Sequence, residues 1–231
     1  MERVFLSYSF RPEDRDPAQW VRTVIESHGM RPVTGDVLGG EQLSDKVKKR
    51  IEAADAFVGI WTRRDPLGGD PETFTTSDWL RDETVYARSK DKPTIVLLES
   101  GVSVVGMGEG HERIPFDRSA PLPAILRLAR TLASWRDEYG RMLRVRLTPE
   151  EVARAAARPN ARYVCRYRLH DGPNQSDWAD VEVVRQAGGV FAFLPNVADR
   201  HLYELWLTLD DEDWQAPAST QEPVASLELV S

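Results

Sequence analysis

The sequence of 231 residues has a single cysteine, only four histidines and no apolar run as long as a membrane helix. Cys165 has no second cysteine with which to form a disulfide bond or a thiolate metal site. The histidines lack the spacing of metal ligands, so we expect no metal and no cofactor: His28, His111, His170 and His201. Because a membrane helix needs about 20 apolar residues and the first residues are too charged for a signal peptide, we expect a cytoplasmic protein with no membrane partner.

The sequence also lacks an excess of basic residues. Residues 1–147 contain 23 basic and 23 acidic residues, whereas residues 148–231 contain 7 and 14, so the second part carries the whole net charge of −7. Sequence-independent binding to nucleic acid needs a basic surface, so we expect no nucleic-acid partner. The change of composition predicts two units with different surfaces.

The first part alternates short apolar runs with amphipathic segments. Residues 4–8, 56–60 and 94–98 have the continuous apolar character of parallel strands that are covered on both faces. Apolar residues recur at helical spacing in residues 17–29, 43–51 and 121–139. This alternation predicts an α/β fold, a flavodoxin-like domain with a central parallel sheet, over residues 1–145.

The hydrophobic period changes from 3.6 to 2 in the second part. Tyr163, Cys165, Tyr167 and Leu169 share one face of a predicted strand, and a second strand alternates in the same way from Tyr203 to Leu209. Gly188-Gly189 indicates a hairpin, and residues 224–230 a last strand. We therefore expect a small antiparallel, sandwich-like β domain of four to six strands at 161–231. Residues 146–160 are expected to be a linker with a short helix, capped by Thr148 and Glu151.

The most pointed chemical feature is a carboxylate between two aromatic residues on one helix. Trp79, Glu83 and Tyr86 are spaced i, i+4, i+7, which places them on one face. Aromatic neighbours desolvate a carboxylate and raise its pKa, whereas a nearby arginine would lower it. The spacing also fits a surface glutamate paired with an arginine beside two core aromatic residues, so it leaves both interpretations open.

Several segments, taken together and in order, resemble the Toll/interleukin-1 receptor (TIR) domains. Residues 3–9 resemble the first box of the family, and residues 29–40 the segment that leads into its BB loop. Residues 43–60, with the step Ile51-Glu52-Ala53-Ala54-Asp55, resemble the helix and strand that follow. Asp78-Trp79-Leu80-Arg81-Asp82-Glu83 is similar to the D-W-x-x-x-E signature of members that hydrolyse NAD+. The resemblance covers about residues 1–140.

The resemblance implies an NAD+ nucleosidase that hydrolyses or cyclises its substrate, with Glu83 as the catalytic residue. It further implies self-association through the TIR domain and a role as a defence effector or signal producer. By position, the substrate-binding residues would be Tyr8, Ser9, Phe10, Arg11, Asp36, Leu38 and Trp79. NAD+ is then a substrate rather than a cofactor.

The sequence departs from the family pattern at three places. Arg11 stands two positions later than the arginine of active members, the third strand ends in Trp61-Thr62 where the family commonly has serine, and residues 63–76 form a long insert. Three other functions therefore stay open: a non-catalytic TIR adaptor that acts by homotypic contacts, a related nucleoside or nucleotide N-glycosidase, and a receiver of a signalling nucleotide.

Features of the second part leave its role open. Its tryptophans, Trp178, Trp206 and Trp214, either mark a recognition surface or belong to the core, and tryptophans in small β domains are more often core residues. The acidic run at residues 210–213 fits either a cation site or a solvated turn. An unknown trigger or protein partner is the expected ligand of this part.

Overall fold

The chain forms two compact units, Met1–Trp135 and Arg136–Ser231, which are described separately. The structure is a computed structural model, and it describes residues 1–35, 44–68, 70–104 and 112–230. The division falls inside one helix, earlier in the chain than the predicted linker at residues 146–160.

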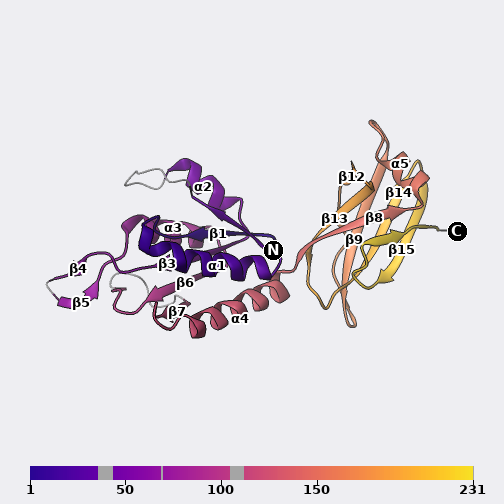
Figure 1. The fold of residues 1–231 in the computed structure, drawn as a ribbon. Helices are drawn as coiled ribbons and strands as arrows, with labels where there is room; N and C mark the ends of the chain where they lie inside the picture. Colours follow the sequence, from indigo (N-terminus) through magenta and orange to yellow (C-terminus); the bar gives the residue numbers. More distant parts are fainter. Residues whose placement is uncertain (36–43, 69, 105–111, 231) are drawn as a thin grey trace. The chain divides into compact units, whose positions relative to one another are not determined.

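A five-stranded parallel sheet forms the centre of the first unit (Figure 1). Its strand order is β2-β1-β3-β6-β7, which is the second, first, third, fourth and fifth strand of the sheet along the chain. This is the flavodoxin-like order of a doubly wound sheet, and it confirms the predicted fold class. The strands are β1 (Arg3–Ser7), β2 (Arg31–Thr34), β3 (Ala56–Trp61), β6 (Thr94–Glu99) and β7 (Arg113–Phe116).

Helices cover both faces of this sheet. Apolar residues of α1 (Arg15–Ser27) and α4 (Leu122–Tyr139) share one core with the sheet. Those of α2 (Asp45–Glu52) and α3 (Asp78–Ser89) pack on the other face. A 3₁₀ turn, η1 (Pro12–Asp14), leads into α1, and β4 (Pro66–Leu67) pairs with β5 (Asp70–Phe74) in the insert. No helix in the described part of the chain has the length and apolar character to cross a membrane.

An ionic cluster ties together the segments that follow four strands of the sheet. The Arg118 guanidinium donates to Asp14 Oδ1 at 2.7 Å and to Glu99 Oε1 at 2.6 Å. Thr62 Oγ1 donates to Asp14, and the Arg63 amide donates to Glu99. Both carboxylates are buried, so their charges depend on these partners.

The second unit consists of two sheets over one core (Figure 1). One has the order β10-β9-β14-β15-β17, with β11 also paired to β9, and the other has the order β12-β13-β8-β16. The first contains β9 (Tyr163–Asp171), β10 (Asn174–Gln175), β11 (Ala179–Asp180), β14 (Leu202–Leu209), β15 (Glu212–Ser219) and β17 (Glu228–Leu229). The second contains β8 (Arg141–Thr148), β12 (Val183–Gln186), β13 (Gly189–Val197) and β16 (Val224–Ser226).

The segment expected as a linker is instead an integral part of this unit. Strand β8 lies inside the four-stranded sheet, and α5 (Glu150–Ala156) buries Val152, Ala153 and Ala156 in the same core. Thr148 does not cap α5. It belongs to β8, and its hydroxyl donates to the Ala225 carbonyl of β16, the strand that runs parallel to β8.

Tight turns join successive antiparallel strands of this unit, and two of them are marked in the sequence. The predicted glycine hairpin joins β12 to β13, with Gln186 opposite Gly189. The acidic run forms the turn between β14 and β15, where Asp210 and Asp211 have φ of 48° and 69°. Two positive φ values in a two-residue loop match the right-handed twist of a hairpin, so this run has a structural function.

Candidate functional site

Glu83 lies on the face of α3 that packs against the sheet. The residue is only 4% exposed, and its neighbours at helical spacing, Leu80, Thr84 and Ala87, are buried with it. Ser7, the last residue of β1, donates a hydrogen bond of 2.5 Å from its hydroxyl to Glu83 Oε2. The interpretation of Glu83 as a surface residue paired with an arginine is therefore wrong.

The electrostatic state of Glu83 follows from this position. Burial raises the pKa of the carboxyl group to about 7, because removal of water disfavours the charged form. The hydrogen bond from Ser7 acts in the opposite direction, and the charge of Asp82 adds to the rise. Near neutral pH the group therefore exists in both protonation states, so a substantial fraction carries the negative charge that charge-stabilising catalysis requires.

Gly35, directly after β2, borders the carboxylate. A Cβ atom at Gly35 would lie 3.8 Å from Glu83 Oε1 and 3.7 Å from Val47. The segment that follows Gly35 contains two predicted substrate-binding residues, Asp36 and Leu38, and both lie outside the described residues.

Two of the predicted pocket aromatics form a parallel pair. The rings of Phe10 and Trp79 have centroids 6.2 Å apart and planes inclined by 8°. Tyr8 contacts Phe10 with its centroid at 4.8 Å, but its ring packs against the core that faces α1 and α4. Since side chains alternate along a strand, Tyr8 is directed to the opposite face of the sheet from Ser7 and Glu83.

Arg11 belongs to a different set of contacts. Its Nε donates to Ser9 Oγ and Asp14 Oδ2, each at 3.3 Å, and a terminal nitrogen donates to the Arg63 carbonyl at 2.7 Å. The structure therefore joins Ser9 and Arg11 to the ionic cluster around Asp14. Among the described residues, no hydrogen bond or ion pair links either of them to Glu83.

Tyr86 does not flank the carboxylate as the helical spacing suggested. Its ring packs against the core formed with α2, and its hydroxyl donates to Glu52 Oε1 at 2.6 Å. The residue next to Glu83 that sequence reasoning missed is Ser7. A hydroxyl at the end of an otherwise apolar strand, 76 positions before Glu83, was the signal that could have found it.

The tryptophans of the second unit divide between surface and core. Trp178 is 38% exposed and Trp206 is partly exposed, so for these two the more frequent core position is not the one observed. Trp214 packs against the core. In the acidic turn, Asp213 accepts hydrogen bonds from Trp206 Nε1 and Thr208 Oγ1. No group of three acidic, histidine or cysteine side chains in the described ranges is arranged to hold a metal ion.

Comparisons with known proteins add little to this geometry. No protein family and no curated protein matches the sequence. Among solved structures, the chain is similar to the CMP N-glycosidase BcmB of Clostridium botulinum, with 16% identity, a TM-score of 0.38, and coverage of 55% of this chain and 97% of that one. It is also similar to the TIR domains of the activated Roq1 resistosome, with 14% identity, a TM-score of 0.31, and coverage of 43% and 58%. Because both TM-scores are below 0.5, neither likeness carries weight for the function.

Proposed function

We propose that the first unit is a TIR-type enzyme that cleaves the bond between nicotinamide and ribose in NAD+, with Glu83 as the catalytic carboxylate. The observation that supports this most is a buried glutamate, hydrogen-bonded to Ser7 at the carboxyl end of a parallel strand, with a pKa of about 7. In doubly wound sheets, ligands bind outside the carboxyl ends of the strands. We infer NAD+ as the substrate because the sequence motifs resemble, in their order, those of TIR domains that hydrolyse NAD+.

The proposed reaction requires little from the protein beyond one negative charge near the ribose. As the bond from C1′ to nitrogen breaks, its electron pair moves to the pyridinium ring, and neutral nicotinamide leaves. The ribose then carries positive charge of oxocarbenium character, which the ionised Glu83 stabilises. Water adds to C1′ and releases a proton, giving ADP-ribose; attack by a nitrogen of the adenine ring would give the cyclic product instead.

Self-assembly is part of the proposal. Residues 1–147 carry no net charge, so copies of this part do not repel each other through a field of one sign. The assay must therefore include the concentrated or crowded protein as well as the dilute one.

The decisive assay is chromatography of nicotinamide released from NAD+ by the full chain, with sedimentation under the same conditions. Glu83→Gln should reduce the rate by about a hundredfold or more, since charge stabilisation at a reacting centre is typically worth that much. Glu52→Gln is the matched control, because Glu52 is a carboxylate on neighbouring α2 that contacts Tyr86 and Lys90 rather than Ser7. Equal release by wild type and Glu83→Gln would refute the mechanism.

The contacts of Arg11 favour a second candidate, an N-glycosidase for nucleosides or mononucleotides. This arginine is held by Asp14 and the Arg63 carbonyl, so its charge is already paired within the described protein rather than free for the second phosphate of a dinucleotide. Incubation with cytidine, CMP and dCMP beside NAD+ separates the two activities. Base release from these compounds without nicotinamide release from NAD+ would replace the first proposal by the second.

A further inference from the structure

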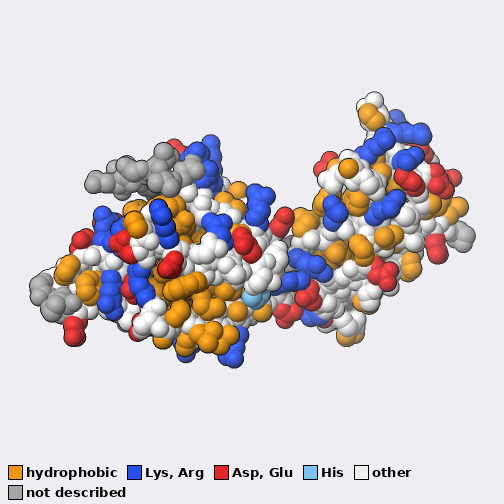
Figure 2. Space-filling model, in the orientation of Figure 1, with side chains coloured by type: hydrophobic (Ala, Val, Ile, Leu, Met, Phe, Trp, Pro, Cys, Tyr) orange, Lys and Arg blue, Asp and Glu red, His pale blue; other side chains and the backbone are white. Residues whose placement is uncertain are grey.

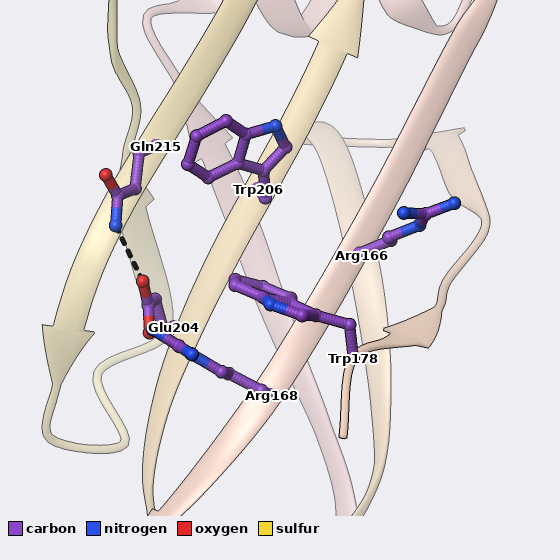
Figure 3. Close-up of a pocket in the computed structure, with 6 residues that line it drawn as sticks. All are labelled: Arg166, Arg168, Trp178, Glu204, Trp206 and Gln215. Carbon is purple, nitrogen blue, oxygen red and sulfur yellow. Dashed lines mark hydrogen bonds and ion pairs between the residues drawn. The ribbon is translucent and has the colours of Figure 1, made fainter. Parts of the chain in front are cut away.

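A cavity of about 380 Å³ opens on the outer face of the six-stranded sheet in the second unit (Figure 3). Its volume lies in the range of ligand pockets, about 300–1,000 Å³. Two indole rings and four polar side chains line it: Arg166, Arg168, Trp178, Glu204, Trp206 and Gln215. None of them belongs to the site around Glu83.

Strand register brings these side chains together. Across β9 and β14, Arg168 pairs with Glu204 and Arg166 pairs with Trp206; across β14 and β15, Trp206 pairs with Gln215. Their neighbours in sequence, such as Cys165, Leu205 and Ala216, point into the core. The cavity floor is therefore built on paired strands, and Trp178, from the segment between β10 and β11, lies over it (Figure 3).

The two indole rings are nearly perpendicular to each other rather than parallel. Their centroids are 6.4 Å apart and their planes are inclined by 75°. The Arg168 guanidinium lies 4.7 Å from the Trp178 ring centroid, which covers one face of that ring with a cation. A flat base sandwiched between parallel rings does not fit this arrangement, whereas a puckered ring resting on one indole and against the edge of the other does.

The buried carboxylate at the cavity, Glu204, already has hydrogen-bond partners within the protein. Glu204 Oε2 accepts from Arg168 Nε and lies 2.9 Å from His170 Nε2, and Oε1 accepts from Gln215 Nε2 at 2.6 Å. Burial alone would raise the pKa of Glu204, but these three hydrogen bonds outweigh it and hold the pKa below its ordinary value. The charge of Glu204 is thus matched by the protein itself, and its role is to fix Arg168 and Gln215 in place.

Both hydrogen-bond donors and a hydrogen-bond acceptor are left for a ligand. Arg166 uses Nε for Asp180, and Gln215 uses its amide nitrogen for Glu204. Within the described residues, the terminal nitrogens of Arg166 and the carbonyl oxygen of Gln215 have no protein hydrogen bond. The cavity therefore offers donors on one side of Trp206 and an acceptor on the other, which suits a ligand with several hydroxyl groups because each hydroxyl both donates and accepts.

Charge disfavours two other ligand classes. A cationic ligand would meet Arg168 on the indole face where it would need to stack. A polyanion would find both arginines of the lining already paired with carboxylates, Arg168 with Glu204 and Arg166 with Asp180. Basic and acidic side chains are interspersed on the face of this unit seen in Figure 2, with no extended basic field. We propose that this cavity binds an uncharged carbohydrate, whose apolar ring face packs on the indole pair and whose hydroxyls contact Arg166 and Gln215.

Titration of the full chain with neutral hexasaccharides tests the proposal, with calorimetry and tryptophan fluorescence as readouts. The probes are cello-, xylo-, malto-, manno- and N-acetylated chitohexaose, all of which are uncharged. At least one should bind, and Trp206→Ala and Trp178→Ala should each weaken it about tenfold or more, as removal of a central aromatic side chain usually does. Trp178→Phe, which keeps a ring, should restore most of the affinity.

Val164→Ala is the matched control, because Val164 is exposed on β9 and pairs with Thr208 outside the cavity. It should leave binding unchanged. Trp178 stands outside the core, so its variants test the site even if Trp206→Ala fails to fold. Absence of binding to all five sugars, or binding that both tryptophan variants leave intact, would overturn the proposal. So would tighter binding of AMP or tetramethylammonium at the same indoles.

Discussion

The Ser7 hydroxyl at the end of β1 donates to the Glu83 carboxylate of α3 across a distance of 2.5 Å. This bond joins the first strand of the sheet to the helix that follows β5 of the insert, so it exists only when the sheet is assembled. It also sets the chemistry of the carboxylate, because burial raises the pKa of Glu83 and Ser7 opposes that rise. The pair is a sensitive point at which to test the proposed function.

Removing the hydroxyl should shift the pH dependence of the reaction. If the ionised Glu83 is the active form, nicotinamide release in wild type rises with pH through about 7. Ser7→Ala removes a hydrogen bond that favours the charged form, and a bond to a charged group is worth about 1.5–3 kcal/mol. The rising limb should therefore move upward by roughly one to two pH units, which rate measurements from pH 5 to pH 9 would detect.

Ser9→Ala is the control for this shift. Ser9 is also buried, but its hydroxyl accepts from Arg11 and has no bond to Glu83. An equal shift in Ser7→Ala and Ser9→Ala, or no shift in either, would show that the Ser7 bond does not set the ionisation of Glu83.

The same carboxylate should make the stability of the first unit fall with pH. Its folded pKa of about 7 lies above the ordinary value of 4.5, so between these values the folded chain holds a proton that the unfolded chain has released. The contribution is complete below about pH 4.5 and is lost as the pH rises through 7. A shift of this size corresponds to about 3 kcal/mol.

Glu83→Gln tests this linkage by removing the titration while it keeps the shape of the side chain. Calorimetric unfolding at pH 5 and pH 8 should show a smaller decrease for Glu83→Gln than for wild type. At pH 8 the variant should be the more stable of the two. A variant with the wild-type pH dependence would mean that the carboxylate is ionised and stabilised in the folded protein.

The parallel rings of Phe10 and Trp79 should act in binding rather than in bond cleavage. Their orientation, 8° from parallel, presents flat surfaces on which nicotinamide or adenine can stack. Phe10→Ala and Trp79→Ala should each raise KM about tenfold with little change in kcat, because stacking holds substrate and transition state alike. Phe74→Ala, in β5 of the insert, should leave both constants unchanged. A loss confined to kcat would place the rings in the chemical step.

The parts that sequence predicts well are those in which a local pattern determines burial. Uninterrupted apolar runs located β1, β3 and β6, and helical periodicity located α1 and α4. The Ser7–Glu83 bond depends on the assembled sheet and could not be read from either segment. In the second unit, the alternation along β14 places Trp206 on the other face of the strand from the core residues Leu205 and Leu207. Only the general preference of tryptophan for cores argued against an outward-facing Trp206.

Arg118 should be essential to the stability of the first unit. Its guanidinium is the shared partner of Asp14 and Glu99, whose side chains are 1% and 7% exposed. Both carboxylates hold the pKa of Arg118 above its ordinary range. Arg118→Ala leaves two buried charges with fewer partners and should cost about 3–5 kcal/mol, measured by urea unfolding. Arg118→Lys, which keeps the charge without the fork, should lose less, and Arg127→Ala on the exposed face of α4 almost nothing. A similar loss of unfolding free energy in Arg127→Ala would show that the ionic cluster has no special part in the stability of the unit.

Gly140 should be irreplaceable in the second unit for two separate reasons. Its φ of 67° lies in the left-handed region, and a Cβ atom there would lie 2.3 Å from the Asn196 carbonyl carbon and 2.6 Å from the Val197 nitrogen. Gly172 shares the backbone conformation, with φ of 59°, but a Cβ atom there meets no atom of the described chain within 4 Å. Gly172→Ala should therefore cost only the backbone term of about 1–2 kcal/mol. Gly140→Ala should cost at least about 2 kcal/mol more, because backbone atoms must move to relieve the overlap. Calorimetry of the two variants separates conformational strain from steric overlap, and equal losses would show that the chain at Asn196 yields without cost.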